Sequence, residues 1–368
     1  MDKRHARIAT ELLSLPTSPF HEQAVAEWAA RFAAGELGLP TAYDRWGNLV
    51  IRYPGRRTKR PLVFAAHMDH PGFAALRMRR DGLLDGLWMG SVPDAVFPGA
   101  RVRFFSGGRW VKGRVKSVAP RKGLRTARPA VLSVSAAVAP GSVGMWDFPD
   151  ARLAGNKLVA RGCDDVAGVA SLLALLDDAV RAKLRTGFQV LLTRAEEAGF
   201  MGAIGAAREK LLPQDAVIVA VENSKALPGA RIGDGPIIRV GDLVATFTPR
   251  LTAFLTRTAQ ELASRDKTFR YQRKLMDGGI CESSAYMEYG YEAGGLCLAL
   301  GNYHNVAPNR RSLRAEYVDA RDFERLVALY LAVVERFESY EKFDGAFRKR
   351  CEGLFRRNRD LLEKPAAQ

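Results

Sequence analysis

The first part of the chain combines helical and strand-like patterns of apolar positions. Residues 4–15 and 22–37 carry apolar side chains at helical spacing, with turn-forming residues between them. Residues 43–53 alternate around a glycine as a hairpin does, and residues 61–66 form a short apolar run typical of a buried strand. We therefore predict two helices, a hairpin and a strand, and the strand leads directly into His67.

The pattern changes over residues 72–150, where short strand-like runs alternate with turns rich in Gly, Pro and Arg. Runs of this kind cover residues 100–105, 109–118 and 130–136. Such a series of short strands is typical of a small β domain. The sequence therefore predicts a β insertion at this point.

After residue 156, helical and strand-like patterns alternate again. The pattern predicts, in order, a helix over residues 166–179, a strand over 188–193, a helix over 199–210, a strand over 216–221 and, later, a long helix over 320–338. This alternation is typical of an α/β fold. We therefore predict an α/β domain that is interrupted by the β insertion.

Length and composition are those of a globular protein with a large core. The chain has 368 residues, of which 47% are hydrophobic. No apolar run approaches the ~20 residues that a membrane-spanning helix needs, and the first residues lack a signal-peptide core. The four cysteines are scattered, as in a protein whose thiols stay reduced. We therefore expect a cytoplasmic protein without a membrane partner.

The net charge of +16 raises the question of a nucleic-acid partner. The basic residues collect in residues 56–60, in residues 122–128 and in a predicted C-terminal helix that includes residues 348–359. No nucleic-acid recognition module is visible, and runs of like charge are usually solvated faces. Specific nucleic-acid binding is therefore not expected, while general association with anions fits the charge.

Candidate chemistry lies at the ends of the predicted strands. His67 and His304 each follow an apolar run, and strand ends are where open α/β sheets place ligands. Between the two histidines, Asp164–Asp165 opens a helix and Glu196–Glu197 marks a strand-to-helix junction. Adjacent carboxylates near buried strand ends need a cation to offset their desolvation and mutual repulsion. A bound divalent metal ion meets that need.

Imidazole and carboxylate ligands together suit zinc, manganese or cobalt, and two such ions ~3.5–4 Å apart can share a carboxylate and a water. Neighbouring residues of an acidic pair point in different directions, so Glu197 can bind metal while Glu196 accepts a proton from water. Each motif alone also fits a structural hydrogen-bonded pair or a solvated helix start. The ordered combination, with Glu222 at another strand end, favours a two-metal hydrolase.

This constellation resembles the dinuclear metallopeptidase clan, and most of all its glutamyl and tetrahedral aminopeptidase family. The resemblance extends over nearly the whole chain and is clearest in the Ala-His-Met-Asp segment that begins at Ala66. It implies a mixed-sheet zinc-peptidase (phosphorylase/hydrolase-like) catalytic domain formed by residues 1–71 and 151–368. It further implies that residues 72–150 form an inserted small β-barrel domain for oligomerisation and access.

The resemblance also implies a role for each residue of the constellation. Glu196 matches the general base, and Asp69 matches the residue that orients the first histidine. Asp164 matches a bridging ligand, and Asp165 matches a neighbour that often follows a cis peptide bond. The ligands expected to hold two divalent ions, with zinc favoured over cobalt or manganese, are His67, Asp164, Glu197, Glu222 and His304.

Some residues depart from the family pattern. The family's aminopeptidases usually have Asp where this chain has Glu222, and Glu at that place often accompanies carboxypeptidase or deacylase activity in related enzymes. Glu282 fits either a group that binds the substrate amine or an ordinary helix start. We interpret His70 as a supporting or exposed residue rather than a ligand, and Cys163 as a packed small residue.

The function predicted first is a metal-dependent exopeptidase, most simply an aminopeptidase that acts on short peptides with a metal-bridging hydroxide and a glutamate base. A homo-oligomer formed through the β insertion is the expected assembly. The first alternative keeps the two-metal site and changes the substrate to an N-acyl amino acid or another small amide. The second alternative, from a different class, is a basic binding protein without catalysis.

Overall fold

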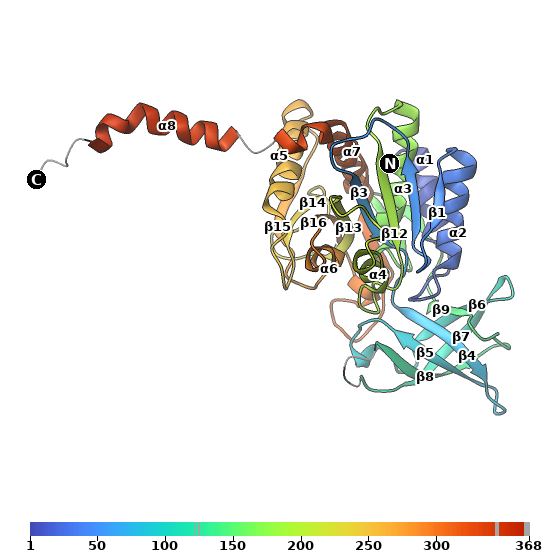
Figure 1. Ribbon diagram of the computed structural model, residues 1–368. Coiled ribbons are helices and arrows are strands. Elements are labelled where there is room, and N and C mark those ends of the chain that lie inside the picture. Colours follow the sequence, from blue (N-terminus) through green and yellow to red (C-terminus); the bar gives the residue numbers. More distant parts are fainter. Residues whose placement is uncertain (122, 124–125, 343–345, 364–368) are drawn as a thin grey trace, which may run out of the picture.

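The central feature of the fold is an eight-stranded mixed sheet, with β12, β3, β13 and β16 running parallel side by side (Figure 1). The computed structural model describes residues 1–121, 123, 126–342 and 346–363. Lys122 and Arg125 of the basic segment 122–128 lie outside these residues. In sheet order the strands are β1 Thr41–Tyr43, β2 Leu49–Tyr53, β12 Phe188–Thr193, β3 Leu62–His67, β13 Val217–Lys225, β16 Glu292–Leu300, β14 Ile237–Gly241 and β15 Gln272–Leu275.

The burial of strand β3 shows that the sheet is covered on both faces. All of its residues are buried, as expected for a parallel strand in the middle of a three-layer fold. Leu62, Phe64 and Ala66 belong to one hydrophobic core, and Val63 and Ala65 belong to another on the opposite face. This alternation follows from the two-residue period of a strand.

The helices divide between the two faces of the sheet. The larger core contains residues of α1 Lys3–Leu12, α2 Gln23–Arg31, α3 Val166–Ala182, α5 Pro249–Arg265 and α7 Ala320–Arg336. The smaller core contains residues of α4 Met201–Arg208 and α6 Glu282–Glu288. The chain therefore folds as a sheet between two helical layers, which confirms the predicted α/β class.

Residues 72–146 form a closed six-stranded barrel below the sheet (Figure 1). Its aromatic core is compact: the ring of Phe73 lies 4.8 Å from that of Trp88 and 5.5 Å from that of Trp146. A side chain at Gly144 would meet the ring of Phe104 at 2.5 Å, so close packing requires glycine there. The predicted small β-barrel is confirmed. Its strands are β4 Gly72–Met78, β5 Leu83–Met89, β8 Ala127–Val134, β7 Arg109–Val118, β6 Arg101–Ser106 and β9 Val143–Trp146.

Several elements differ from the sequence-based prediction. The helix predicted over residues 22–37 is α2 followed by one π-helical turn, Phe32–Glu36. Strand β13 continues beyond the predicted residue 221 to Lys225. A small sheet of β10 Arg152–Ala154, β11 Lys157–Ala160 and β17 Glu316–Asp319 connects the barrel to the rest of the chain, and neither it nor helix α5 was predicted.

The predicted C-terminal basic helix is α8, Ala346–Glu363, which extends away from the rest of the molecule (Figure 1, in red). It follows helix α7 and a 3-10 segment, Phe337–Lys342. Within the described residues, no helix combines the length and the apolar character that crossing a membrane requires.

Candidate metal centre

The predicted site residues meet at the carboxyl ends of the parallel strands. His67 is the last residue of β3, and Glu196 and Glu197 follow the end of β12. Glu222 lies within β13 rather than at its end. His304 lies in a single helical turn, Tyr303–Asn305, just after β16. Because parallel neighbours end at one edge of a sheet, side chains distant in sequence converge there.

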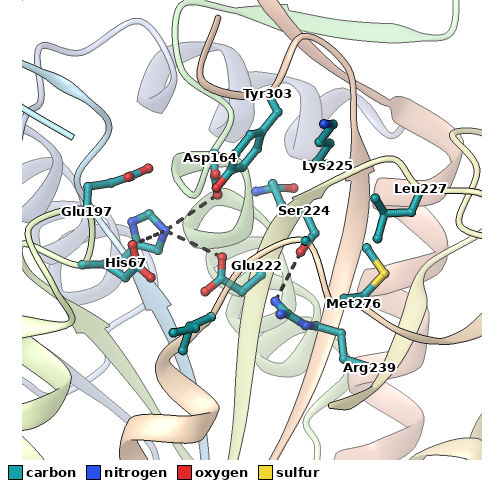
Figure 2. A pocket seen from close by; sticks show the side chains of 15 residues that line it. His67, Asp164, Glu197, Glu222, Ser224, Lys225, Leu227, Arg239, Met276 and Tyr303 are labelled. Carbon is teal, nitrogen blue, oxygen red and sulfur yellow. Dashed lines mark hydrogen bonds and ion pairs between the residues drawn. The ribbon is translucent and has the colours of Figure 1, made fainter. Parts of the chain in front are cut away.

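The first group of potential ligands surrounds His67 (Figure 2). Its Nε2 atom lies 3.7 Å from Asp164 Oδ1, 3.8 Å from Glu222 Oε2 and 3.8 Å from Glu196 Oε2. Atoms bound at ~2.0–2.2 Å to one tetrahedral ion lie roughly 3.3–3.6 Å apart. The spacing therefore suits a single ion after small adjustments.

The second group consists of His304, Glu197 and Asp164. The Nε2 atom of His304 lies 2.9 Å from Glu197 Oε1 and 3.5 Å from Asp164 Oδ2. Asp164 thus presents Oδ1 to the first group and Oδ2 to the second. This is the arrangement that a carboxylate adopts when it bridges two ions.

Both histidines are held in the orientation that a metal ligand requires. The Nδ1 atom of His67 lies 3.1 Å from the backbone oxygen of Asp69, and that of His304 lies 2.8 Å from the backbone oxygen of Ser91. A carbonyl oxygen only accepts hydrogen bonds, so the proton belongs on Nδ1 in both rings. The Nε2 lone pairs are then free for a metal ion.

The side chain of Asp69 fixes the acidic pair. Its Oδ1 accepts a hydrogen bond from the backbone nitrogen of Glu196 at 2.9 Å, and its Oδ2 accepts one from that of Glu197 at 3.0 Å. The same carboxylate is 3.4 Å from His67 Nδ1. Asp69 therefore orients the two glutamates as well as the histidine, a wider role than the resemblance implied.

The turn before the acidic pair is held by segments from the start of the chain. Ala195 has a left-handed backbone, with φ of 52°, which costs about 1–2 kcal/mol for a residue with a side chain. The buried Glu22 accepts hydrogen bonds from Ala195 N at 3.0 Å and from Arg194 Nε at 2.7 Å. Asn48 accepts one from Arg194 N. These contacts hold the turn in its unfavourable conformation.

Electrostatics indicate that the site is built for a cation. Burial by itself would lower the pKa of His67, but the surrounding carboxylates, first among them Glu196, raise it well above its ordinary value. Burial, with help from nearby carboxylates, raises the pKa of Glu196 well above its usual range. Asp164 Oδ1 and Glu222 Oε1 are buried and have no hydrogen-bond partner among the described residues. Two divalent ions would supply the missing positive charge, so the residues fit them.

Other predicted residues lie around this centre. His70 is buried, with Nδ1 2.7 Å from the backbone oxygen of Asp164 and Nε2 2.9 Å from Asn305 Oδ1, so it supports the site from behind. Cys163 is a buried free thiol. Glu282 begins α6 and accepts a hydrogen bond from Thr193 at 2.5 Å. Glu282 is buried and is not among the residues that border the pocket. The peptide bond between Asp164 and Asp165 is cis.

Sequence reasoning missed some contributors. Ser91 acts through its backbone oxygen, which no side-chain pattern reveals. The buried Glu316 accepts hydrogen bonds from the backbone nitrogens of Cys163 and Asp164 at 2.6 and 3.1 Å. Arg239 lies in the apolar strand β14 and lines the pocket with only 3% of its surface exposed. A lone arginine within an apolar run was the available signal.

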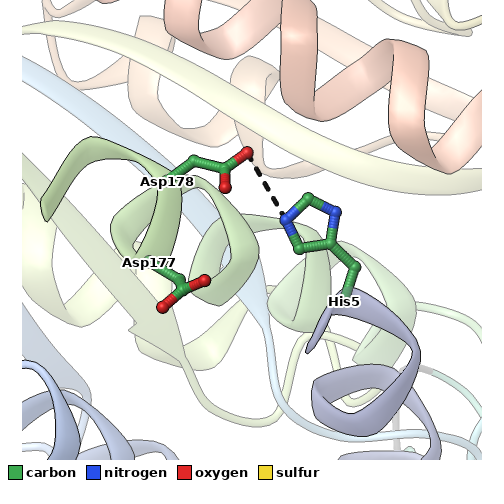
Figure 3. Close-up of side chains that lie close together, drawn as sticks. All are labelled: His5, Asp177 and Asp178. Carbon is green, nitrogen blue, oxygen red and sulfur yellow. Dashed lines mark ion pairs between the residues drawn. The ribbon is translucent and has the colours of Figure 1, made fainter. Parts of the chain in front are cut away.

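A further group, His5, Asp177 and Asp178, has ligand-type atoms close together but lies on α1 and α3, away from the pocket (Figure 3). Arg4 already forms an ion pair with Asp177. His5 lies 3.0 Å from Glu324 on α7 and 3.4 Å from Asp178. We interpret the group as an ion-pair network that joins three helices.

Comparisons with solved structures support the fold. The aminopeptidase APDkam598 from the archaeon Desulfurococcus kamchatkensis is 23% identical, with a TM-score of 0.74 over 93% of this chain and 98% of that chain. The TET1 peptidase of Pyrococcus horikoshii, described as able to assemble into a tetrahedron or a large octahedral shell, is 21% identical. Its TM-score is 0.73 over 90% of this chain and 99% of that one.

Sequence comparisons place the chain in a family. The cytosol non-specific dipeptidase of Escherichia coli (strain K12) is 26% identical over 201 residues, which are 54% of this chain and 29% of that relative's length. The chain thus matches less than a third of that protein. The model of the M42 glutamyl aminopeptidase family matches residues 131–329, more than half of the chain. The protein therefore belongs to the M42 glutamyl aminopeptidase family.

Proposed function

We propose that the protein is a metal-dependent aminopeptidase that removes the first residue of short peptides. The observation that carries this proposal is Asp164, whose two carboxylate oxygens face two histidines at 3.7 and 3.5 Å. Membership of a peptidase family supports the same reaction. The proposal assigns His67, Glu222 and Asp164 to one divalent ion, and His304, Glu197 and Asp164 to the other.

When bound, such ions polarise the peptide carbonyl and make a water molecule acidic enough to attack near neutral pH. The mixed imidazole and carboxylate ligands suit zinc first, and cobalt or manganese next. Four of the five ligands come from β3, β13 and the segments after β12 and β16, so the sheet sets their spacing, while Asp164 lies between β11 and α3. Rigid elements of this kind hold a site more precisely than mobile loops do.

We assign the general base to Glu196. Its carboxylate lies as close to His67 Nε2 as that of Glu222 does, at 3.8 Å, so distance alone would also allow it as a ligand. Asp164 already supplies an oxygen to that group, which leaves Glu196 free. Its raised pKa favours proton transfer from water to the leaving amine. The hydrogen bond from its backbone to Asp69 holds it beside the reacting atoms.

The pocket suggests an acidic first residue. Beyond the proposed ligands it is bordered by Met276, Ile280 and Arg239. The buried guanidinium of Arg239 donates a hydrogen bond to Ser224 at 3.2 Å (Figure 2). Within the part of the chain that the structure describes, its Nε has no hydrogen-bond partner. A buried guanidinium with unused donors binds carboxylates well. We therefore propose a preference for peptides that begin with Glu or Asp.

The deacylase alternative raised by Glu222 also fits this pocket. Arg239 suits the carboxylate of an N-acyl amino acid as well as that of an acidic first residue. A panel of substrates separates the two functions. After chelation and reloading with zinc, cobalt or manganese, glutamyl and leucyl amides with free amines would be compared with N-acetylglutamate. Aminopeptidase function predicts turnover of glutamyl amides and loss of turnover when their amine is acetylated. Faster hydrolysis of N-acetylglutamate would overturn the proposal.

We also propose that the chain forms a homo-oligomer through the barrel and works in the cytoplasm. The TET1 peptidase, whose fold this chain shares, is described as assembling into closed shells. The barrel carries a groove in which Leu76 is 46% exposed, beside Arg77 and Asp85. All four cysteines are free thiols, as expected for a reducing compartment. Native mass spectrometry of the full chain and of a Leu76→Asp variant tests the assembly.

A further inference from the structure

Helix α8 exposes apolar side chains that no other described part of the chain covers. The exposed fractions of Leu354, Phe355, Leu361 and Leu362 are 44%, 55%, 70% and 73%. The helix extends from the body and does not pack on the sheet or the barrel (Figure 1). A cluster of exposed apolar side chains marks a site of interaction with a partner. The span matched by the family model ends at residue 329, before this helix begins.

The apolar side chains of α8 share one side of the helix. At ~100° per residue, Cys351, Leu354, Phe355, Leu361 and Leu362 fall within a sector about 120° wide. This apolar sector also contains Asn358. The Asn358 side chain donates a hydrogen bond to the backbone oxygen of Leu354 at 2.8 Å, which lowers the cost of removing it from water.

Arginines border the apolar sector on both sides. By the same geometry, Arg350 and Arg357 lie along one edge, and Arg348 and Arg359 lie along the other. Lys349 and Arg356 lie on the opposite, polar side together with the acidic residues of the helix, which are Glu352, Asp360 and Glu363. The positive charge is therefore concentrated where the apolar sector meets the polar side.

This charge is largely uncompensated. Among the described residues, Arg359 is the one basic residue of α8 that forms an ion pair, with Glu363 at 2.6 Å. The basic segment 56–60 behaves differently, because Arg56 pairs with Glu338 at 3.3 Å and Lys59 with Glu341 at 3.5 Å. Three of the four edge arginines, Arg348, Arg350 and Arg357, are thus available to an anionic partner.

We infer that α8 binds in the plane of an anionic lipid surface, with its apolar sector inserted at the boundary between headgroups and acyl chains. Leucine and phenylalanine side chains would enter the acyl region, and the edge arginines would contact lipid phosphates on both sides. A second copy of the helix fits poorly, because two apolar sectors in contact would bring arginine edges together. A nucleic acid would use the charge but leave the apolar sector exposed.

Binding at a lipid surface needs no membrane-spanning segment. The absence of such a segment was the reason for expecting no membrane partner. The experiment uses the full chain and sedimentation with phosphatidylcholine vesicles, with and without phosphatidylglycerol. Binding to the anionic vesicles should exceed binding to the neutral ones by about tenfold or more, and should weaken with salt. Hydrolysis of a small soluble substrate should be unchanged in every α8 variant.

Two double variants test whether the position of the charges on α8 matters. They are matched because each removes two positive charges. Arg350→Gln with Arg357→Gln changes one edge of the apolar sector, whereas Lys349→Gln with Arg356→Gln changes the polar side. The edge variant should weaken vesicle binding several-fold more than the polar-side variant. Leu361→Ser with Leu362→Ser should weaken it by about tenfold or more, because two apolar side chains that would enter the lipid are lost.

Equal effects of the two charge variants would overturn the inference, as would unchanged binding after the two leucines are replaced. Duplex DNA or RNA provides the remaining comparison. Tight, salt-sensitive binding to a duplex, together with no preference for anionic vesicles, would assign α8 to nucleic acid instead. Loss of oligomer mass in the leucine variant without any vesicle binding would assign it to self-association.

Discussion

His304 of the candidate metal centre donates a hydrogen bond from Nδ1 to the backbone oxygen of Ser91, at 2.8 Å. Ser91 lies just after strand β5 of the barrel, so a segment of the barrel orients a proposed metal ligand that follows strand β16. We predict that His304→Ala lowers the metal content from two ions to one, because the second group loses its imidazole. Ser91→Ala should keep both ions, since the contact uses the backbone. Metal analysis of the purified variants checks both statements, and equal metal content in the two would refute them.

Replacing Glu196 tests the assignment of the base. Glu196→Gln should leave the metal content unchanged and reduce kcat by about 10²–10⁴-fold, because the amide cannot accept a proton. Glu288→Gln is a matched control, since Glu288 is exposed on α6. If Glu196→Gln instead loses a metal ion, Glu196 is a ligand rather than the base.

The affinity for metal should rise with pH. Burial opposes the charged forms of His67 and His304, but the carboxylates around them raise both pKa values well above the ordinary range. Below those pKa values the rings are protonated and must release a proton before they bind a metal ion. The apparent Kd should therefore become tighter from pH 6 upward. Competition with a coloured chelator at several pH values measures this, and a Kd independent of pH would contradict it.

Arg239 should determine selectivity for acidic substrates. Arg239→Met should lower the ratio of kcat/KM for glutamyl over leucyl amides by about tenfold or more, because a substrate carboxylate would lose its buried partner. The leucyl substrate reports whether the catalytic centre itself survives the change. Lys225→Met is the comparison, since Lys225 borders the same pocket but is exposed. Equal loss for both substrates in Arg239→Met would assign Arg239 to structure instead.

The ion-pair network of α1 should make stability depend on pH. Burial would lower the pKa of His5, but Asp178 and Glu324 raise it to about 9. The folded state therefore binds a proton more tightly than the unfolded state, whose histidine has a pKa of ~6.5. The resulting stabilisation, of the order of 2–3 kcal/mol, is complete below pH ~6.5 and is lost as pH rises towards 9.

Urea unfolding of the metal-free protein at both ends of this range measures the effect. His5→Gln should destabilise the protein at pH 6 and have little effect above pH 9. His21→Gln is the control, because the ring of His21 contacts the backbone oxygen of Pro19 rather than a carboxylate. The same loss of stability for His5→Gln at both pH values would mean that packing, not the ion pairs, is responsible.

Much of this architecture could be predicted from the sequence because it depends on regular patterns. The apolar run before His67 and the largely apolar helix after Asp165 directly reflect burial on both faces of β3 and around nearly all of α3. The acidic pairs were recognisable because carboxylates rarely follow apolar runs without a charged partner. The residues around the site could therefore be listed before their geometry was known.

What the sequence could not reveal depends on backbone geometry or distant packing. The contact of Ser91 uses a carbonyl oxygen, which every residue has. The left-handed conformation at His304, with φ of 53°, carries its side chain back towards the sheet from beyond the end of β16. Strand β14 was missed because Arg239 interrupts its apolar pattern, although the arginine is buried beside Glu222.

The hydrogen bonds from the backbones of Glu196 and Glu197 to Asp69 make one side of the pocket intolerant of substitution, whereas the opposite side can vary. One carboxylate positions a proposed ligand and a proposed base together, so a shift of that turn changes metal binding and proton transfer at once. The opposite wall of the pocket comes from β14 and from residues 276–280, and it includes Met276, Ile280 and Arg239. New substrate preferences can therefore arise by substitution on that wall while the chemistry stays the same.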